Sequence, residues 1–246
     1  MKRKLSLWIV SILANSLMNN TYLHCQMVNG VYKFDLLKVG ELEGQDGWIA
    51  TALYSKEGHL NVVQTNRDSG SKAITGTPGK TRYYFRKFRP EDKLPPFKND
   101  DRTLVIQFDI MSGPHSGTFF VGGEQTGVAI IWDEVIKVRS NGITGKMPLL
   151  TTATPPDIPS GTWVTLRLEI SNKNASLLWK ACEEEDADFV PFAEADDFEV
   201  GELLESAHTW DRMGVAIGRA GTMQINNLVP NAIVLNNANE TPLQDE

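Results

Sequence analysis

The chain has 246 residues, of which 41% are hydrophobic, and it carries a formal net charge of −7 at pH 7. This hydrophobic content is enough for a sizeable core and excludes a chain that is disordered throughout. The acidic balance argues against nucleic acid as a partner, because nucleic-acid-binding surfaces are basic.

Residues 1–25 have the pattern of a secretory signal peptide. Lys2, Arg3 and Lys4 precede an apolar stretch from Leu5 to Met18, which is the charged and then hydrophobic order of such signals. The stretch is too short for a helix that spans a bilayer, which needs about 20 apolar residues. We therefore predict a secreted protein (extracellular, periplasmic or on the cell surface) that makes no membrane contact after cleavage. A retained anchor and lipidation of Cys25 are the alternatives.

Residues 26–246 are expected to form a single domain. Turn residues separate short segments in which apolar and polar residues alternate, and this alternation is typical of strands with one buried face. The predicted strands are Val31 to Leu37, Trp48 to Tyr54, Leu60 to Thr65, Thr81 to Phe88, Thr103 to Met111, Gly117 to Val121, Val128 to Trp132, Val135 to Arg139, Thr162 to Ile170, Ala175 to Lys180, Arg212 to Ile217 and Thr222 to Val229. One short helix is predicted from Val200 to Ala207. This pattern indicates an all-β fold, an antiparallel two-sheet β-sandwich.

Only two cysteines occur in the chain, Cys25 and Cys182. If signal cleavage removes Cys25, no intrachain disulfide can form, and the fold must be stabilised by burial of apolar surface. Cys182 is expected to be a small buried apolar residue rather than a nucleophile.

Several segments resemble a known family. The segment from Gly40 to Trp48 (GELEGQDGW) and the closing segment from Ile217 to Val229 (IGRAGTMQINNLV) are similar to the first and last strand regions of concanavalin A-like lectin/glucanase (LamG-like) domains. Phe108-Asp109 and Gly161 to Trp163 fall in the order that such a jelly roll would require. The resemblance covers most of residues 31 to 235. It implies two stacked sheets, one of them concave, with sugars as the commonest ligands.

That superfamily also contains glycoside hydrolases and polysaccharide lyases. Glu194, Asp196 and Glu199 have the spacing of the glucanase carboxylates, which act as acid and nucleophile or base. However, the intervening Asp197 would then be buried without a partner, which is costly. The lyase motifs of the family are absent, and no catalytic residue is predicted. A polysaccharide-degrading enzyme with a divergent site remains an alternative.

The histidines of the domain, His59, His115 and His208, are expected in solvated turns and have no spacing typical of a zinc site. Between Glu183 and Glu205 the chain has eleven acidic residues and no Lys or Arg. This run is interpreted as a solvated excursion between strands. Calcium is the alternative, because it prefers clustered oxygen ligands, but the run lacks an Asp-x-Asp-x-Asp-Gly motif. No cofactor is predicted.

A basic segment supplies the first candidate ligand contacts. Alternation in the strand from Thr81 places Arg82, Tyr84 and Arg86 on one face. Such a face could bind an anionic polysaccharide, with Arg forking onto carboxylate or sulfate and Tyr stacking on a sugar ring. The alternative is that the tyrosines pack in the core while the arginines are solvated.

Three more candidates, His115, Glu124 and Trp132, fall near strand ends that could line a common edge. The neighbouring Gly122-Gly123 indicates a bulge or a close backbone approach. We predict a secreted, non-catalytic module that binds carbohydrate or another surface ligand, with a glycan as its partner. A structural protein of the envelope or matrix is a further alternative.

Overall fold

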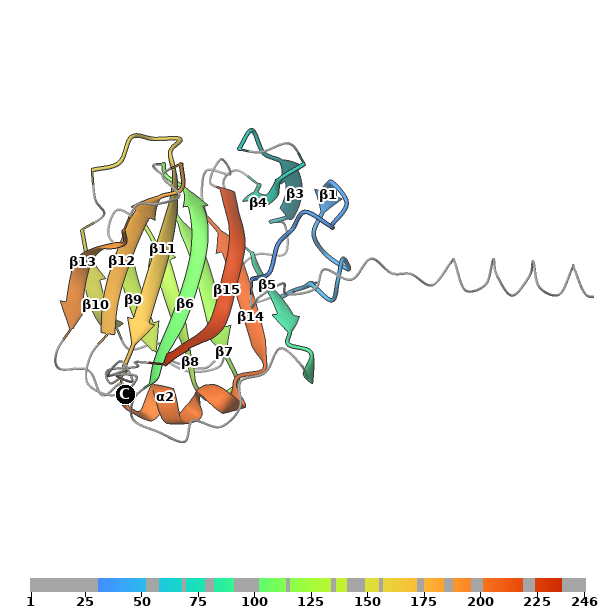
Figure 1. The fold of residues 1–246 in the computed structure, drawn as a ribbon. Helices are drawn as coiled ribbons and strands as arrows, with labels where there is room; N and C mark the ends of the chain where they lie inside the picture. Colours follow the sequence, from blue (N-terminus) through green and yellow to red (C-terminus); the bar gives the residue numbers. More distant parts are fainter. Residues whose placement is uncertain are drawn as a thin grey trace, which may run out of the picture.

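The computed structural model describes residues 31–51, 58–67, 70–77, 82–90, 102–113, 116–133, 136–140, 149–154, 157–171, 175–183, 188–195, 201–218 and 224–235. Within these residues the strands form two stacked antiparallel sheets (Figure 1). The expected all-β sandwich is confirmed. No helix among the described residues has the length and apolar character needed to cross a bilayer.

The first sheet has eight strands in the described part of the chain, and every neighbouring pair is antiparallel. In spatial order they are β1 (Gly40–Glu41), β3 (Leu60–Gln64), β4 (Lys72–Gly76), β15 (Gln224–Leu235), β6 (Arg102–Met111), β11 (Trp163–Ile170), β12 (Ala175–Ala181) and β13 (Val190–Ala195). The long strands β6, β11 and β15 form its centre. This sheet carries the site described below.

The second sheet has seven strands within the same described ranges. Their order is β10 (Leu149–Ala153), β9 (Ile136–Ser140), β8 (Gly127–Trp132), β7 (Gly117–Gly122), β14 (Arg212–Ile217), β5 (Tyr83–Lys87) and β2 (Ile49–Ala50). A short helix, α2 (Gly201–Ser206), continues into the 3-10 turn η2 (Ala207–Thr209) and lies at one end of the sandwich (Figure 1). This is the predicted helix.

The core lies between the two sheets because apolar residues alternate along the central strands. In β6, Ile106, Phe108 and Ile110 point inward and are almost fully buried. Phe108 meets Phe119 of β7 from the opposite sheet, with ring centroids 5.2 Å apart. Burying such a side chain stabilises the fold by about 1.5–3 kcal/mol. Asp109, which lies between Phe108 and Ile110 in the sequence, therefore points to the outer face of the first sheet.

Some predicted elements need correction. Val31 to Leu37 is not a strand, since it forms only a bridge from Tyr32 to Leu228 and then turns. Strands β1, β4, β10 and β13 are absent from the predicted strands. The acidic run is not one continuous excursion, because it contains β13 and α2.

The segment of residues 40–48 folds against β5 through one buried carboxylate. Asp46 has a left-handed φ of 45°, which Asp tolerates better than most residues. Its oxygens accept hydrogen bonds from Tyr32 Oη at 3.0 Å, Arg86 Nε at 3.1 Å and Arg89 Nη2 at 3.0 Å. Trp48 Nε1 donates to Tyr32 Oη at 2.9 Å. The glycine-rich segment is thus tied to the second sheet.

Gly122 makes the close backbone approach expected for the Gly122-Gly123 pair. A Cβ atom at Gly122 would lie 2.5 Å from Gly127 Cα and 2.6 Å from the Thr126 carbonyl oxygen. No larger residue fits there without a backbone shift. The glycine allows β7 and β8 to turn tightly into one another.

Candidate functional site

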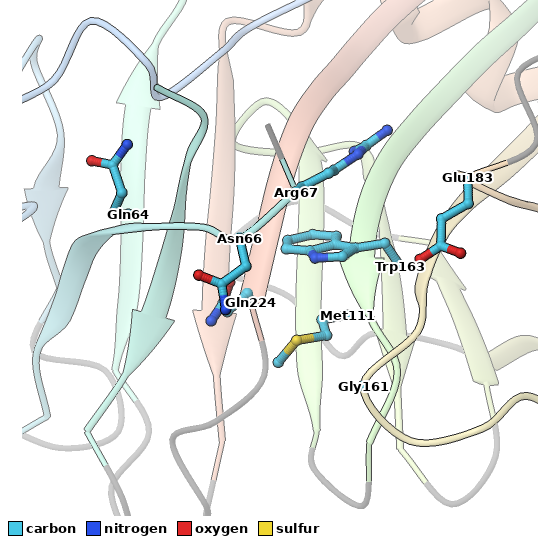
Figure 2. Close-up of a pocket in the computed structure, with 8 residues that line it drawn as sticks. All are labelled: Gln64, Asn66, Arg67, Met111, Gly161, Trp163, Glu183 and Gln224. Carbon is cyan, nitrogen blue, oxygen red and sulfur yellow. The ribbon is translucent and has the colours of Figure 1, made fainter. Parts of the chain in front are cut away.

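A polar pocket opens on the outer face of the first sheet (Figure 2). Its volume is about 340 Å³. It forms where β3, β6 and β12 end and β11 and β15 begin, and antiparallel pairing brings these ends to the same side of the sheet. The lining residues are Gln64, Asn66, Arg67, Met111, Gly161, Trp163, Glu183 and Gln224.

The lining combines hydrogen-bonding side chains with one aromatic wall. Gln64, Asn66 and Gln224 carry amides, each of which can donate and accept hydrogen bonds. Glu183 adds an exposed carboxylate. Trp163 is 8% exposed, and the Arg67 guanidinium lies over its ring, 5.8 Å from the centroid. The pocket can therefore pair with a ligand that presents several hydroxyl groups.

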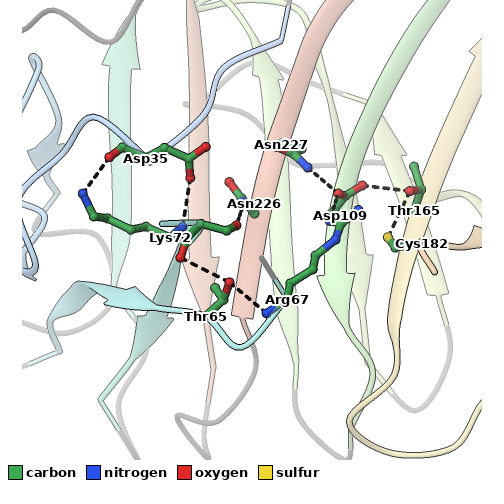
Figure 3. A network of polar contacts seen from close by, with 10 residues as sticks. Asp35, Thr65, Arg67, Lys72, Asp109, Thr165, Cys182, Asn226 and Asn227 are labelled. Carbon is green, nitrogen blue, oxygen red and sulfur yellow. Dashed lines mark hydrogen bonds and ion pairs between the residues drawn. The ribbon is translucent and has the colours of Figure 1, made fainter. Parts of the chain in front are cut away.

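A buried carboxylate holds Arg67 in place (Figure 3). Asp109 is only 3% exposed and forms an ion pair with the Arg67 guanidinium. It also accepts hydrogen bonds from Thr165 Oγ1 at 2.8 Å and from Asn227 Nδ2 at 2.6 Å. These donors compensate the charge that burial would otherwise penalise. The position of Arg67 beside Trp163 is thus fixed from within the sheet.

An irregularity in β15 supplies one of these donors. Asn227 has a φ of 47°, and the pairing of β15 with β6 shifts register between Asn226 and Val229. Asn tolerates this left-handed conformation, and the bulge turns its amide toward Asp109. Asn226 is also buried, and its Nδ2 donates to Ser71 Oγ at 3.4 Å. The Asn-Asn pair of the closing segment therefore supports the outer face of the sheet.

Cys182 adjoins the same network as a buried thiol. Its Sγ lies 3.3 Å from Thr165 Oγ1. Burial, reinforced by the negative charge of Asp109, raises the pKa of the thiol to about 11. A thiol with a raised pKa stays protonated at neutral pH, and a protonated thiol is a poor nucleophile. The expectation that Cys182 is a small buried apolar residue is confirmed, since it packs with Ala73 and Trp163.

The predicted basic face of β5 points inward and lies outside the pocket. Tyr84 is fully buried, and Arg86 is 2% exposed, ion-paired with Asp46 and 4.8 Å over the Tyr32 ring. Arg82 is half-buried, and its Nη1 lies 3.8 Å from a Glu43 carboxylate oxygen. The prediction that these residues share a face is therefore correct, but this face points toward the core. Tyr84 and Arg86 are thus buried where a ligand on the surface cannot contact them. The alternative, in which the arginines are solvated, is wrong for Arg86, because this side chain is buried.

Of the other predicted contacts, Glu124 and Trp132 do not share an edge. Glu124 lies in the turn before β8, 75% exposed and 3.9 Å from Arg212. Trp132 is at the far end of β8 and belongs to the core. The expectation of a common edge is thus wrong for this pair. His115 lies outside the described residues.

The described histidines, His59 and His208, do not line the pocket. His59 Nδ1 lies 2.7 Å from Glu41 Oε1, and His208 Nδ1 lies 2.7 Å from the Glu205 carbonyl oxygen, both at exposed positions. Glu194 lies in β13, whereas Asp196 and Glu199 fall outside the described residues. Over the described ranges, no group of three or more His, Cys, Asp or Glu is placed to hold a metal ion.

The pocket residues were largely missed because amides carry no sequence motif. In the sequence, Arg67 belongs to no motif, and Trp163 lies at the start of the predicted strand from Thr162 to Ile170. The signal that could have found the site is the clustering of polar residues at strand ends that an antiparallel sheet must bring to one side.

Comparison with known proteins finds likenesses of fold only. No protein-family model and no curated protein matches the chain. Among solved structures, the CBM2 module of the evolved Dit of Lactobacillus casei BL23 phage J-1 aligns with a TM-score of 0.46 and 8% identity, covering 78% of this chain and 96% of that one. Lectin II from Ulex europaeus aligns with a TM-score of 0.46 and 10% identity, over 80% and 95% of the two chains. The Ca²⁺-bound exoplasmic/lumenal domain of VIP36 aligns with a TM-score of 0.44 and 11% identity, covering 77% of this chain and 84% of that one.

Proposed function

We propose that this chain is an exported, non-catalytic carbohydrate-binding module whose glycan site is the pocket of Gln64, Asn66, Arg67, Trp163, Glu183 and Gln224. The observation that carries the proposal is the convergence of three amide side chains with a carboxylate and an indole in one pocket. Sugars present many hydroxyls, and such groups bind donors and acceptors at fixed positions. The volume of about 340 Å³ is at the small end of ligand pockets. It suits a short saccharide unit.

The charges of the pocket favour a neutral glycan over an anionic one. The described lining has one cation, Arg67, and one anion, Glu183. Because Arg67 is ion-paired with Asp109, its charge is already compensated. The basic strand that suggested an anionic polysaccharide places Tyr84 and Arg86 in the interior. A sugar rich in hydroxyls and free of acidic groups therefore fits the site best.

Export belongs to the same proposal and rests on the amino-terminal pattern of Lys2-Arg3-Lys4 followed by apolar residues. Protein expressed with its native amino terminus should be recovered from the exported fraction and begin near Gln26. That material is the sample for a glycan array, followed by calorimetric titration of the neutral oligosaccharides that it retains.

Variants of the amides test whether the pocket is the site. Gln64→Ala and Gln224→Ala should each weaken glycan binding by about 2- to 12-fold, the equivalent of one net hydrogen bond. Gln125→Ala is the matched control, since Gln125 is an exposed amide in the turn between β7 and β8 of the other sheet. Equal affinities for all three variants and the wild type would exclude this pocket. An array on which the protein retains no glycan would exclude the function.

A further inference from the structure

The ion pair beneath the pocket has a consequence for which sugars the pocket accepts. Arg67 is the only cation among the described lining residues, and a guanidinium is the group that best recognises a sugar carboxylate or sulfate, through two parallel hydrogen bonds. Its side chain is 23% exposed, whereas that of Asp109 is 5% exposed. The cation therefore reaches the pocket, but its counter-ion does not.

An acidic sugar that binds another edge of the guanidinium would meet a cation whose charge Asp109 already compensates, and one that takes the Nη1 edge must separate the guanidinium from Asp109. Asp109 would then keep its hydrogen bonds from Thr165 and Asn227 but would lose its opposite charge. A buried carboxylate left without its cation is strongly destabilised. In addition, the incoming anion would face the negative charge of Asp109. A neutral sugar has no such cost, because it can bind while the ion pair stays intact.

We infer that Asp109 is a specificity-determining residue: by holding Arg67, it makes the pocket select uncharged sugars over acidic ones. This inference rests on the proposed function. Asp109 acts through Arg67 and needs no contact with the ligand. Replacing Asp109 with a neutral residue of the same shape would leave Arg67 able to fork onto a carboxylate, and the preference would shift toward acidic sugars.

The test compares affinities for matched pairs of ligands. The probes are gluco-, galacto- and manno-oligosaccharides and the oligouronides of the same configurations, titrated against the mature protein. The wild type should bind the neutral member of at least one pair more tightly. In Asp109→Asn the affinity for the oligouronide, relative to its neutral partner, should rise by at least about tenfold, as expected for a new charge-assisted pair.

Two controls separate selectivity from mere damage to the site. Thr165→Val removes one hydrogen bond to Asp109 but keeps both charges, so the ratio of the two affinities should stay within about threefold of the wild-type ratio, because the ion pair remains. Glu183→Gln removes an exposed charge that is screened by solvent while Arg67 remains held, so it should also change the ratio by less than about threefold.

The outcomes are distinct. A folded Asp109→Asn with an unchanged ratio overturns the inference. If Asp109→Asn does not fold, Glu183→Gln still decides, because a tenfold shift toward oligouronides in that variant would show that Glu183, and not the ion pair of Arg67 with Asp109, sets the preference for neutral sugars, and would overturn the inference. A wild type that prefers oligouronides overturns the inference and leaves the carbohydrate-binding function standing. A wild type that binds no member of any pair removes both.

Discussion

Removing the Asp46 carboxylate should destabilise the fold more than any surface change. The side chains of Asp46 and Arg86 are 4% and 2% exposed, so Asp46→Ala leaves a buried guanidinium without its counter-ion. Breaking a buried pair in this way costs about 3–5 kcal/mol. Alanine at a φ of 45° adds about 1–2 kcal/mol. Against a total stability of about 5–15 kcal/mol, the loss is large.

Urea unfolding followed by tryptophan fluorescence measures this loss as a change in the free energy of unfolding. Asp46→Asn should cost less than Asp46→Ala, because asparagine keeps an acceptor oxygen and tolerates the left-handed backbone. The double variant Asp46→Asn, Arg86→Met should recover part of the loss, since no buried charge then remains in the pair. A loss below about 1 kcal/mol for Asp46→Ala would refute the stabilising role of the pair.

Two further predictions follow from other buried groups. Burial raises the pKa of the Cys182 thiol from 9.0 in the unfolded chain to about 11 in the folded one. Between pH 9 and 11 the unfolded state therefore loses its proton first, and the free energy of unfolding of the wild type, relative to that of Cys182→Ala, should fall by on the order of 2 kcal/mol. A difference that stays constant with pH would argue against burial of the thiol. Gly122→Ala should lower the free energy of unfolding by about 1–3 kcal/mol, because the new Cβ atom would meet the backbone of Gly127 and Thr126. Gly123→Ala is the milder control, since the nearest atom to a Cβ there lies at 3.4 Å. Equal thermal midpoints for the two variants would contradict the close approach.

The strands that the sequence predicts are those with one clean buried face. In β6, inward Phe108 and outward Asp109 alternate as expected, and the strand is recognised almost residue for residue. In β4, by contrast, the neighbours Ala73 and Ile74 are both buried, because the outer face there is also covered, and the alternation is lost. β13 contains Pro191 and lies at the edge of its sheet, where proline is tolerated but no strand pattern is formed.

The site was harder to predict, because alternation shows which residues share a face but not which face is inside. Tyr84 and Arg86 do share a face of β5, which begins one residue after Arg82, yet a buried partner, Asp46, allows Arg86 to point into the interior. Asp46 lies in a turn 40 residues earlier in the chain, and no pattern of neighbouring residues predicts that it pairs with Arg86. The pocket amides have the same difficulty, since Gln64 and Gln224 meet only through the order of the strands in the sheet.

The two faces of the first sheet divide the work of stability and recognition. The inward residues of β6 and β11, such as Phe108 and Leu166, belong to the large core between the sheets. The outward ones, Asp109 and Thr165, form the network beneath the pocket. Because neighbours in sequence point to opposite faces, the strands that hold the sandwich together also position the pocket. Substitutions at the outward positions can therefore change what the pocket accepts while the core between the sheets keeps its packing.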